Sequence, residues 1–261
     1  MEAASRVVKS VCYSLIEEKR NKLHTTESSD ADILSVAMES GCFSDDDLVN
    51  QLMTFLVAGH ETIASSLSWA IYLLCKHPDI QTRLREEIGT LLPKVQDVAW
   101  IPTSAEIDRL PYLNAICHEV LRVIPPVPLT PRVAAIDTSI LGQFIPKGTV
   151  LIIPPWAANT SRELWGDDAA DFNPDRWTGP GRANTGGADS NYSFLTFLHG
   201  PRSCIGQNFA MAEFACLLAA WFGTFETELA DKDFVAEVKN GITARPNKLE
   251  VRLKLIEARE G

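Results

Sequence analysis

The stretch from Phe197 to Ala210 constrains this chain of 261 residues more than any other. It reads FLHGPRSCIGQNFA, and Pro201 and two glycines interrupt regular structure before apolar residues return at helical spacing. The stretch therefore predicts a loop that opens directly into a helix, with Cys204 just before the first turn. A thiol in that position faces unpaired backbone N–H groups and the positive end of the helix dipole, which favour the thiolate.

The neighbours of Cys204 suit a thiolate that binds the iron of a haem. Gly206 leaves room for a flat cofactor to approach the sulfur, Arg202 can hold a carboxylate, and Phe197 can shield the thiolate from water. An axial thiolate needs each of these supports. For a lone cysteine, a buried and inert thiol would be the commoner interpretation.

Five positions in this run resemble the haem-binding loop of the cytochrome P-450 monooxygenases, whose pattern is Phe-x-x-Gly-x-Arg-x-Cys-x-Gly. The matching residues are Phe197, Gly200, Arg202, Cys204 and Gly206, within the loop 197–206. The resemblance implies a mainly α-helical cytochrome P-450 fold with small β-sheets. It also implies haem b as cofactor, with Cys204 as the axial ligand of the iron and Arg202 holding a propionate.

Composition limits the function classes that remain. A net charge of −10 argues against nucleic acid as a partner. No run of about eighteen apolar residues is present, so we expect no transmembrane helix, and the N-terminus lacks the apolar region of a signal peptide. The six cysteines form no CxxC pair and no zinc-ligand spacing, which predicts reduced thiols.

A long helix is predicted over 44–76, because Ser44 can cap it and three aspartates follow in its first turn. At about 1.5 Å per residue it would be about 48 Å long. Near its middle, the hydroxyl of Thr62 can take a carbonyl from the helix ladder and open a local bulge. A kink with a surface acid and a buried threonine would be the plain interpretation.

The segment that contains Glu61 and Thr62 resembles the family's (Ala/Gly)-Gly-x-(Asp/Glu)-Thr motif in the helix over the distal haem face. The resemblance implies that Thr62 hydrogen-bonds dioxygen or its proton-donating water. It implies that Glu61 helps to relay the protons needed for O–O cleavage.

A second helix, predicted over 111–123, places Glu119 and Arg122 on one face. In the family such a pair is locked by an arginine from a later segment, and residues 172–177 resemble that segment, with Asp175 where glutamate is commoner. The resemblance implies a buried structural cluster of Glu119, Arg122 and Arg176. Removing one partner would leave a buried charge unpaired, at a cost of roughly 3–5 kcal/mol.

The remaining segments predict further helices, strands and loops around these motifs. Amphipathic helices are expected over 3–23 and 78–91, and loops over 24–32, 93–102 and 178–192. Short β-rich runs at 132–134, 138–141 and 149–154 suggest a small sheet, and 225–229 and 249–253 a terminal one. By resemblance, Arg132 binds a propionate, although a surface arginine is the alternative. Residues 127–130 would line the substrate pocket, which the turn at 241–246 would reach.

The resemblance covers nearly the whole chain as one haem domain, 1–261, yet corresponds to the C-terminal half or so of a family member. We therefore expect a fragment, a truncated product or a short relative, with the N-terminal part and membrane anchor not encoded. The implied activity inserts one oxygen atom of O₂ into a lipophilic organic substrate, with electrons from NADPH through a flavoprotein reductase. The expected setting is the cytoplasmic side of the endoplasmic reticulum, in fungal-type secondary metabolism.

Two alternatives accompany this interpretation. The chain could be a catalytically silent remnant that acts as a haem-binding or association module. A thiolate-haem isomerase or dehydratase that bypasses O₂ is disfavoured, because such enzymes need no acid–threonine pair.

Overall fold

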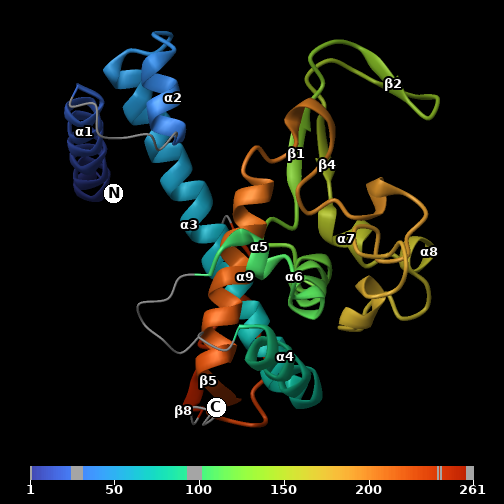
Figure 1. Cartoon of the computed structure of the whole chain (residues 1–261). Helices are drawn as coiled ribbons and strands as arrows, with labels where there is room; N and C mark the ends of the chain where they lie inside the picture. Colours follow the sequence, from blue (N-terminus) through green and yellow to red (C-terminus); the bar gives the residue numbers. More distant parts are fainter. Residues whose placement is uncertain (1, 25–31, 93–101, 240, 242, 257–261) are drawn as a thin grey trace. The chain divides into compact units, whose positions relative to one another are not determined.

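The computed structural model describes residues 2–24, 32–92, 102–239, 241 and 243–256, which form two compact units, 1–61 and 62–261. The boundary between the two units falls within helix α3 (Asp45–Lys76; Figure 1). A helix of this length can serve two hydrophobic clusters. Of the loops predicted over 24–32 and 93–102, only residues 24, 32 and 102 are among the described residues, and position 242 of the turn 241–246 also lies outside them.

The first unit contains α1 (Glu2–His24), α2 (Ile33–Glu39) and the first half of α3. Helix α3 is capped at Ser44, as the sequence predicts. Ser44 Oγ accepts the N–H of Asp47 at 3.2 Å, and Asp47 Oδ2 accepts the N–H of Ser44 at 3.1 Å. A small apolar cluster holds the unit together; its buried members are Cys12, Ile16, Leu48 and Val49.

The second unit is built on α4 (Pro78–Leu91), α6 (Pro111–Val123) and α9 (Gln207–Thr224), which pack on one another. A short helix, α5 (Ser104–Ile107), packs against α9 and begins with a capping box at Thr103. The second half of α3 joins the same core through side chains such as Ile63 and Leu74. Proline begins both α4 and α6, where its missing N–H costs no helical hydrogen bond.

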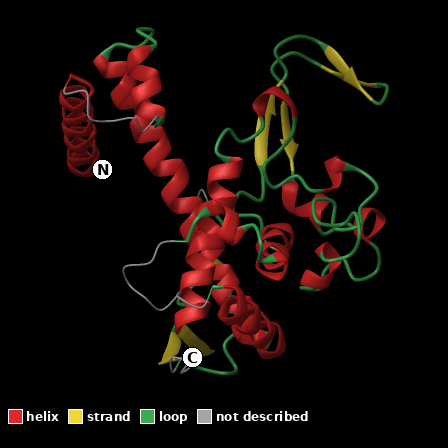
Figure 2. Ribbon diagram, viewed as in Figure 1, coloured by secondary structure: helices red, strands yellow, loops and turns green. Residues whose placement is uncertain are grey.

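Strands in the described residues pair two by two, all antiparallel (Figure 2). The pairs are β1 (Thr130–Val133) with β4 (Val150–Ile153), β2 (Thr138–Ile140) with β3 (Gln143–Ile145), β5 (Phe225–Leu229) with β8 (Val251–Leu255), and β6 (Val238–Lys239) with β7 (Arg245–Pro246).

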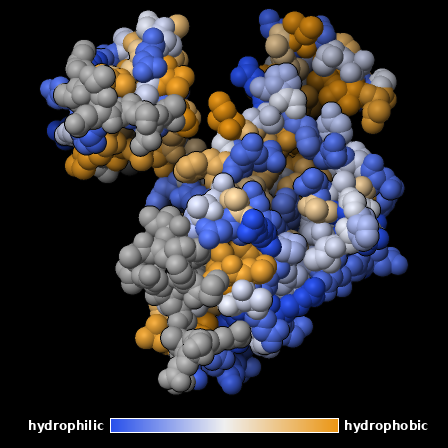
Figure 3. All heavy atoms as spheres, viewed as in Figure 1, coloured by the Kyte–Doolittle hydropathy of each residue, from blue (hydrophilic) through white to orange (hydrophobic). Residues whose placement is uncertain are grey.

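The single small sheet predicted over 132–154 is therefore two separate ribbons. Leu141 and Gly142 both have positive φ, at 49° and 81°, so β2 folds straight back on β3. Strand β1 then pairs with β4 across this hairpin. Apolar side chains gather on the hairpin surface (Figure 3), where Ile140, Leu141 and Phe144 are exposed.

The segment between β4 and α9 contains five short helices that the sequence analysis missed. They are α7 (Pro155–Asn159), α8 (Arg162–Trp165), η1 (Pro174–Trp177), η2 (Asn191–Ser193) and η3 (Gly200–Arg202). Each is too short for a helical period to appear in the sequence.

No described helix carries an apolar stretch long enough to cross a bilayer. All six cysteines are free thiols.

The loop predicted over 178–192 packs against two tryptophans through a glycine. Gly186 has a φ of +58°, and a Cβ built there would lie 2.8 Å from Trp165 Cζ3 and 3.1 Å from Trp177 Cζ2. Only a glycine meets both the backbone conformation and the close contact.

Replacing this glycine should destabilise the second unit. We expect Gly186→Ala to lower the free energy of unfolding by about 2–4 kcal/mol, because left-handed strain adds to overpacking. Gly181 is the matched control, since it has a φ of +70° but no atom within 4 Å of the built Cβ. Urea unfolding of both variants gives the comparison, and equal losses would contradict a role for the tryptophan contact.

Candidate functional site

A cavity of about 220 Å³ lies within the second unit and gathers residues from distant parts of the chain. Thr62 reaches it from α3, Val127 and Thr130 from the segment after α6, and Cys204 from the loop before α9. The full lining is Thr62, Ile63, Ser66, Leu121, Pro126, Val127, Thr130, Pro155, Thr196, Phe197, Leu198, Arg202, Cys204, Ala210 and Phe214. It is thus an apolar pocket with a few polar groups, as small-molecule sites usually are.

The loop that carries Cys204 is closed by its own backbone. The N–H of Cys204 donates to the carbonyl of Phe197 at 2.8 Å, across the turn at Gly200, whose φ is +76°. Helix α9 then begins with Gly206 as its N-cap. The side chain of Cys204 is exposed, and a Cβ built on Gly206 would meet no atom within 4 Å.

Thr62 and Glu61 are consecutive residues of α3, and both are half-buried. Thr62 lines the cavity, and its backbone carbonyl accepts the hydroxyl of Ser66 at 2.9 Å. The α-helical pattern is continuous through residues 58–62, so the bulge considered from the sequence does not form. The hydrogen-bond ladder of α3 tolerates Thr62, a weak helix former, because the residues around it are stronger helix formers.

Two arginines lie at or beside the cavity. Arg202 lines it and is exposed. Arg132, on β1, does not line it, but its Nη1 donates to Oγ1 of the lining residue Thr130 at 2.9 Å and to the carbonyl of Pro131 at 2.8 Å. Within the described residues neither arginine forms an ion pair with a carboxylate.

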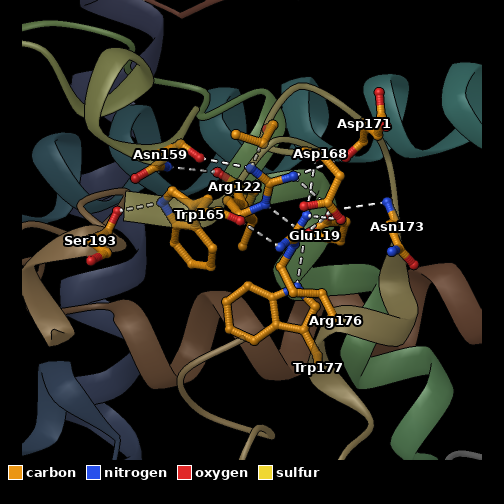
Figure 4. Close-up of polar contacts among 12 residues, drawn as sticks. Glu119, Arg122, Asn159, Trp165, Asp168, Asp171, Asn173, Arg176, Trp177 and Ser193 are labelled. Atoms are coloured by element: carbon orange, nitrogen blue, oxygen red, sulfur yellow. Dashed lines mark hydrogen bonds and ion pairs between the residues drawn. The ribbon is translucent and has the colours of Figure 1, made fainter. Parts of the chain in front are cut away.

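Glu119 and Arg122 form a fully buried, two-pronged ion pair on α6 (Figure 4). Arg122 Nε donates to Glu119 Oε2 and its Nη2 to Oε1, both at 2.8 Å. The remaining donors of Arg122 reach three backbone carbonyls: that of Asn159, at the end of α7, at 2.8 Å, that of Ala169 at 2.6 Å and that of Asp171 at 2.9 Å. Every face of the guanidinium is therefore satisfied.

Arg176 joins this pair, but its stronger partner is a residue that the sequence analysis missed. Its Nε lies 3.7 Å from Glu119 Oε1, whereas its Nη2 lies 2.8 Å from Asp168 Oδ2. The hydrogen bond from Arg176 lowers the pKa of Asp168. Asp175, which stands where the family more often has glutamate, instead contacts Arg83 Nη1 at 2.7 Å on the surface.

Three more residues complete the cluster and were not predicted. Trp177 Nε1 donates to Glu119 Oε2 at 2.8 Å, and the N–H of Asn173 donates to Oε1 at 2.9 Å. Buried Asn159 donates to Oγ1 of Thr196 at 2.8 Å, which links the cluster to a residue of the cavity wall. For Trp177 the sequence did offer a signal. It directly follows Arg176, and a buried indole N–H needs an acceptor such as the Glu119 carboxylate.

Comparison with known proteins places this site in a family. A family model described as Cytochrome P-450 matches residues 1–253. The chain belongs to the cytochrome P-450 family. It is 54% identical over 248 residues to cytochrome P-450 monooxygenase sphH of Aspergillus fumigatus, covering 94% of this chain and 46% of the relative.

Two further fungal relatives resemble this cytochrome P-450 chain over nearly its whole length. Cytochrome P-450 monooxygenase FUM15 of Gibberella moniliformis is 41% identical over 305 aligned positions, covering 98% of this chain and 51% of the relative. ALT8 of Alternaria alternata is 41% identical over 300, covering 98% and 50%. The chain thus spans about half the length of the curated relatives it matches.

The residues present fit the haem that cytochrome P-450 membership implies. Among the cavity-lining side chains, the thiol of Cys204 is the soft donor, and Gly206 leaves open space near it. The described residues hold no group of three or more His, Cys, Asp or Glu side chains that could bind a metal ion. This donor set suits a metal that brings its other ligands with it, as haem iron does.

Neutralising the buried carboxylate of Glu119 should destabilise the second unit. We expect Glu119→Gln to lower the free energy of unfolding by about 3–5 kcal/mol, because Arg122 keeps its charge in a dry site. Asp175→Asn is the control, since its pair with Arg83 is more than half exposed on both sides and should contribute less than about 1 kcal/mol. Denaturant unfolding measures both, and a similar loss in the two variants would refute the central role of Glu119.

Proposed function

We propose that the cavity holds haem b through Cys204, and that the whole protein is a haem-thiolate monooxygenase. It would insert one atom of O₂ into a lipophilic organic substrate, in fungal secondary metabolism. The observation that carries the proposal is that Thr62, from α3, lines the same apolar cavity as Arg202 and Cys204, from the loop before α9.

The Cys204 loop is suited to hold the cofactor. Bound haem supplies the iron centre at which O₂ is reduced. Cys204 would hold that iron through its sulfur as the thiolate, and the hydrogen bond from its N–H to the carbonyl of Phe197 fixes the loop. Phe197 lines the same cavity and would shield the bound sulfur, and Gly206 leaves room for the ring. The guanidinium groups of Arg202 and Arg132 pair with the propionates.

Proton delivery falls to α3. Reduction of O₂ to water and an inserted oxygen atom consumes two protons. Thr62 lines the cavity, where its hydroxyl would donate a hydrogen bond, and Glu61, the residue before it, would resupply the proton. The apolar walls around Ile63, Val127 and Phe214 bind the lipophilic substrate and exclude water.

We assign the electron supply to NADPH through a flavoprotein reductase, at the cytoplasmic side of the endoplasmic reticulum. The support is family membership and the monooxygenase names of three fungal relatives.

A second candidate is a catalytically silent haem-binding or association module. It is favoured by the exposure of two apolar residues beside Cys204, since Ile205 is 92% and Phe209 68% exposed. Apolar side chains in such positions often mark an interface. Concentration-dependent association without reductant consumption would favour this candidate.

The thiolate assignment predicts a specific spectrum. The chain loaded with haem, reduced and bound to carbon monoxide should show the strongly red-shifted Soret band of a thiolate–iron unit. Cys204→Ser should lose that band, because a hydroxyl is a poor ligand for this iron. Cys42→Ser, at another exposed cysteine, should keep it. A thiolate band that persists in Cys204→Ser would remove Cys204 from the site.

The role of Thr62 predicts uncoupling rather than loss of haem. In the full-length protein, Thr62→Ala should keep haem and NADPH consumption, yet form several-fold less product and release peroxide, because protons arrive less selectively. Thr62→Ser keeps the hydroxyl and should stay closer to wild type. Product yield per NADPH is the measurement, and equal coupling in Thr62→Ala and wild type would exclude the proton role.

A further inference from the structure

The backbone N–H and carbonyl of Ala244, a residue outside the cavity, bond to two elements that line it. Ala244 is buried, and its carbonyl accepts two hydrogen bonds from α3, from Ser65 Oγ at 2.5 Å and from Trp69 Nε1 at 2.7 Å. Its own N–H donates to the carbonyl of Pro126 at 2.8 Å. The donors from α3 are themselves buried, with Ser65 at 2% and Trp69 at 3% exposure.

The two elements that Ala244 connects both contribute residues to the cavity lining. Helix α3 contributes Ile63 and Ser66 to the cavity, and the segment after α6 contributes Pro126 and Val127. Ser65 and Trp69 do not line the cavity, but their hydrogen bonds connect α3 to Ala244, which in turn bonds to Pro126 of the lining.

The Trp69 side chain, which donates to the Ala244 carbonyl, is itself held in place by its neighbours. Trp69 packs edge-on against Tyr72 with ring centroids 5.8 Å apart, and the Tyr72 hydroxyl accepts the N–H of Ala236 at 3.3 Å. The indole N–H of Trp69 therefore has little freedom to leave the Ala244 carbonyl. Removing both donors would leave this buried carbonyl without a hydrogen bond, which costs free energy.

We propose that Ser65 and Trp69 are positioning residues that fix the separation of the two cavity walls through the Ala244 peptide. They thereby set the bulk of the ligand that the cavity admits. The inference rests on the proposed function of the cavity as the substrate pocket of a haem-thiolate enzyme.

The test compares four chains: wild type, Trp69→Phe, the double variant Ser65→Ala/Trp69→Phe, and Ser68→Ala. The two phenylalanine variants keep an aromatic ring and remove one or both donors. Ser68 is the matched control, because its hydroxyl donates to the carbonyl of Ala64 within the same helix.

The first readout needs no cofactor. Hydrogen exchange at the amide of Ala244 should rise about tenfold in the double variant and less in Trp69→Phe, because loss of the α3 bonds frees the peptide. Ser68→Ala should exchange as wild type does. Wild-type exchange in the double variant would show that these bonds do not hold Ala244.

The second readout measures ligand bulk in the haem-loaded chains. Binding of 1-methylimidazole and of the bulkier 4-phenylimidazole is followed by the spectral shift each causes. The ratio of their dissociation constants should change at least about threefold in the double variant and stay constant in Ser68→Ala. An unchanged ratio alongside faster exchange would overturn the proposal.

The two readouts separate this inference from the function on which it rests. If wild type gave no imidazole shift, the proposed function would fail and ligand selection with it, while exchange would still decide whether α3 holds Ala244. If Trp69→Phe and the double variant were both unfolded at room temperature, the hydrogen bonds to Ala244 would be needed for folding itself. That result would also count against a positioning role.

Discussion

The ion pair between Glu119 and Arg122 lies where α6 meets α7, the turn before η1 and η1 itself, and solvent reaches neither side chain. A buried pair of charges stabilises a fold only when every lone pair and proton has a partner. Here the Glu119 carboxylate accepts hydrogen bonds from N–H groups of Arg122, Asn173 and Trp177. The remaining N–H groups of the Arg122 guanidinium donate to backbone carbonyls. The pair therefore fixes irregular segments that have no sheet or long helix of their own to hold them.

The cavity depends on this cluster through a short chain of hydrogen bonds. Asn159 accepts the N–H of Leu195 and donates to Thr196, and Thr196 donates to the carbonyl of Leu121. Thr196 precedes Phe197, whose carbonyl closes the Cys204 loop. The buried charges and the candidate thiolate ligand thus belong to one continuous polar framework, while apolar side chains fill the space between. This arrangement lets a loop residue be placed accurately although the loop is exposed.

The sequence predicted the elements whose signals are local. The cap at Ser44, the helices over 78–91 and 111–123 and the loop before α9 can each be read from residues close together in the chain. It misjudged the strands of 132–154, because pairing partners are chosen across the turn at Leu141 and Gly142 and not by β-propensity. It also missed Asp168, since nothing near that aspartate in the sequence indicates that it meets Arg176 eight residues later.

By itself, the sequence determined the family, the long helix that carries Thr62 and the loop that presents Cys204, because each depends on residues close together in the chain. Tertiary structure alone decided which of these residues share a cavity, that Arg132 stands beside it rather than in it, and that Ala244 joins two of its walls. The physical reason is that burial and hydrogen bonding between distant segments are satisfied jointly, by backbone groups that carry no mark in the sequence.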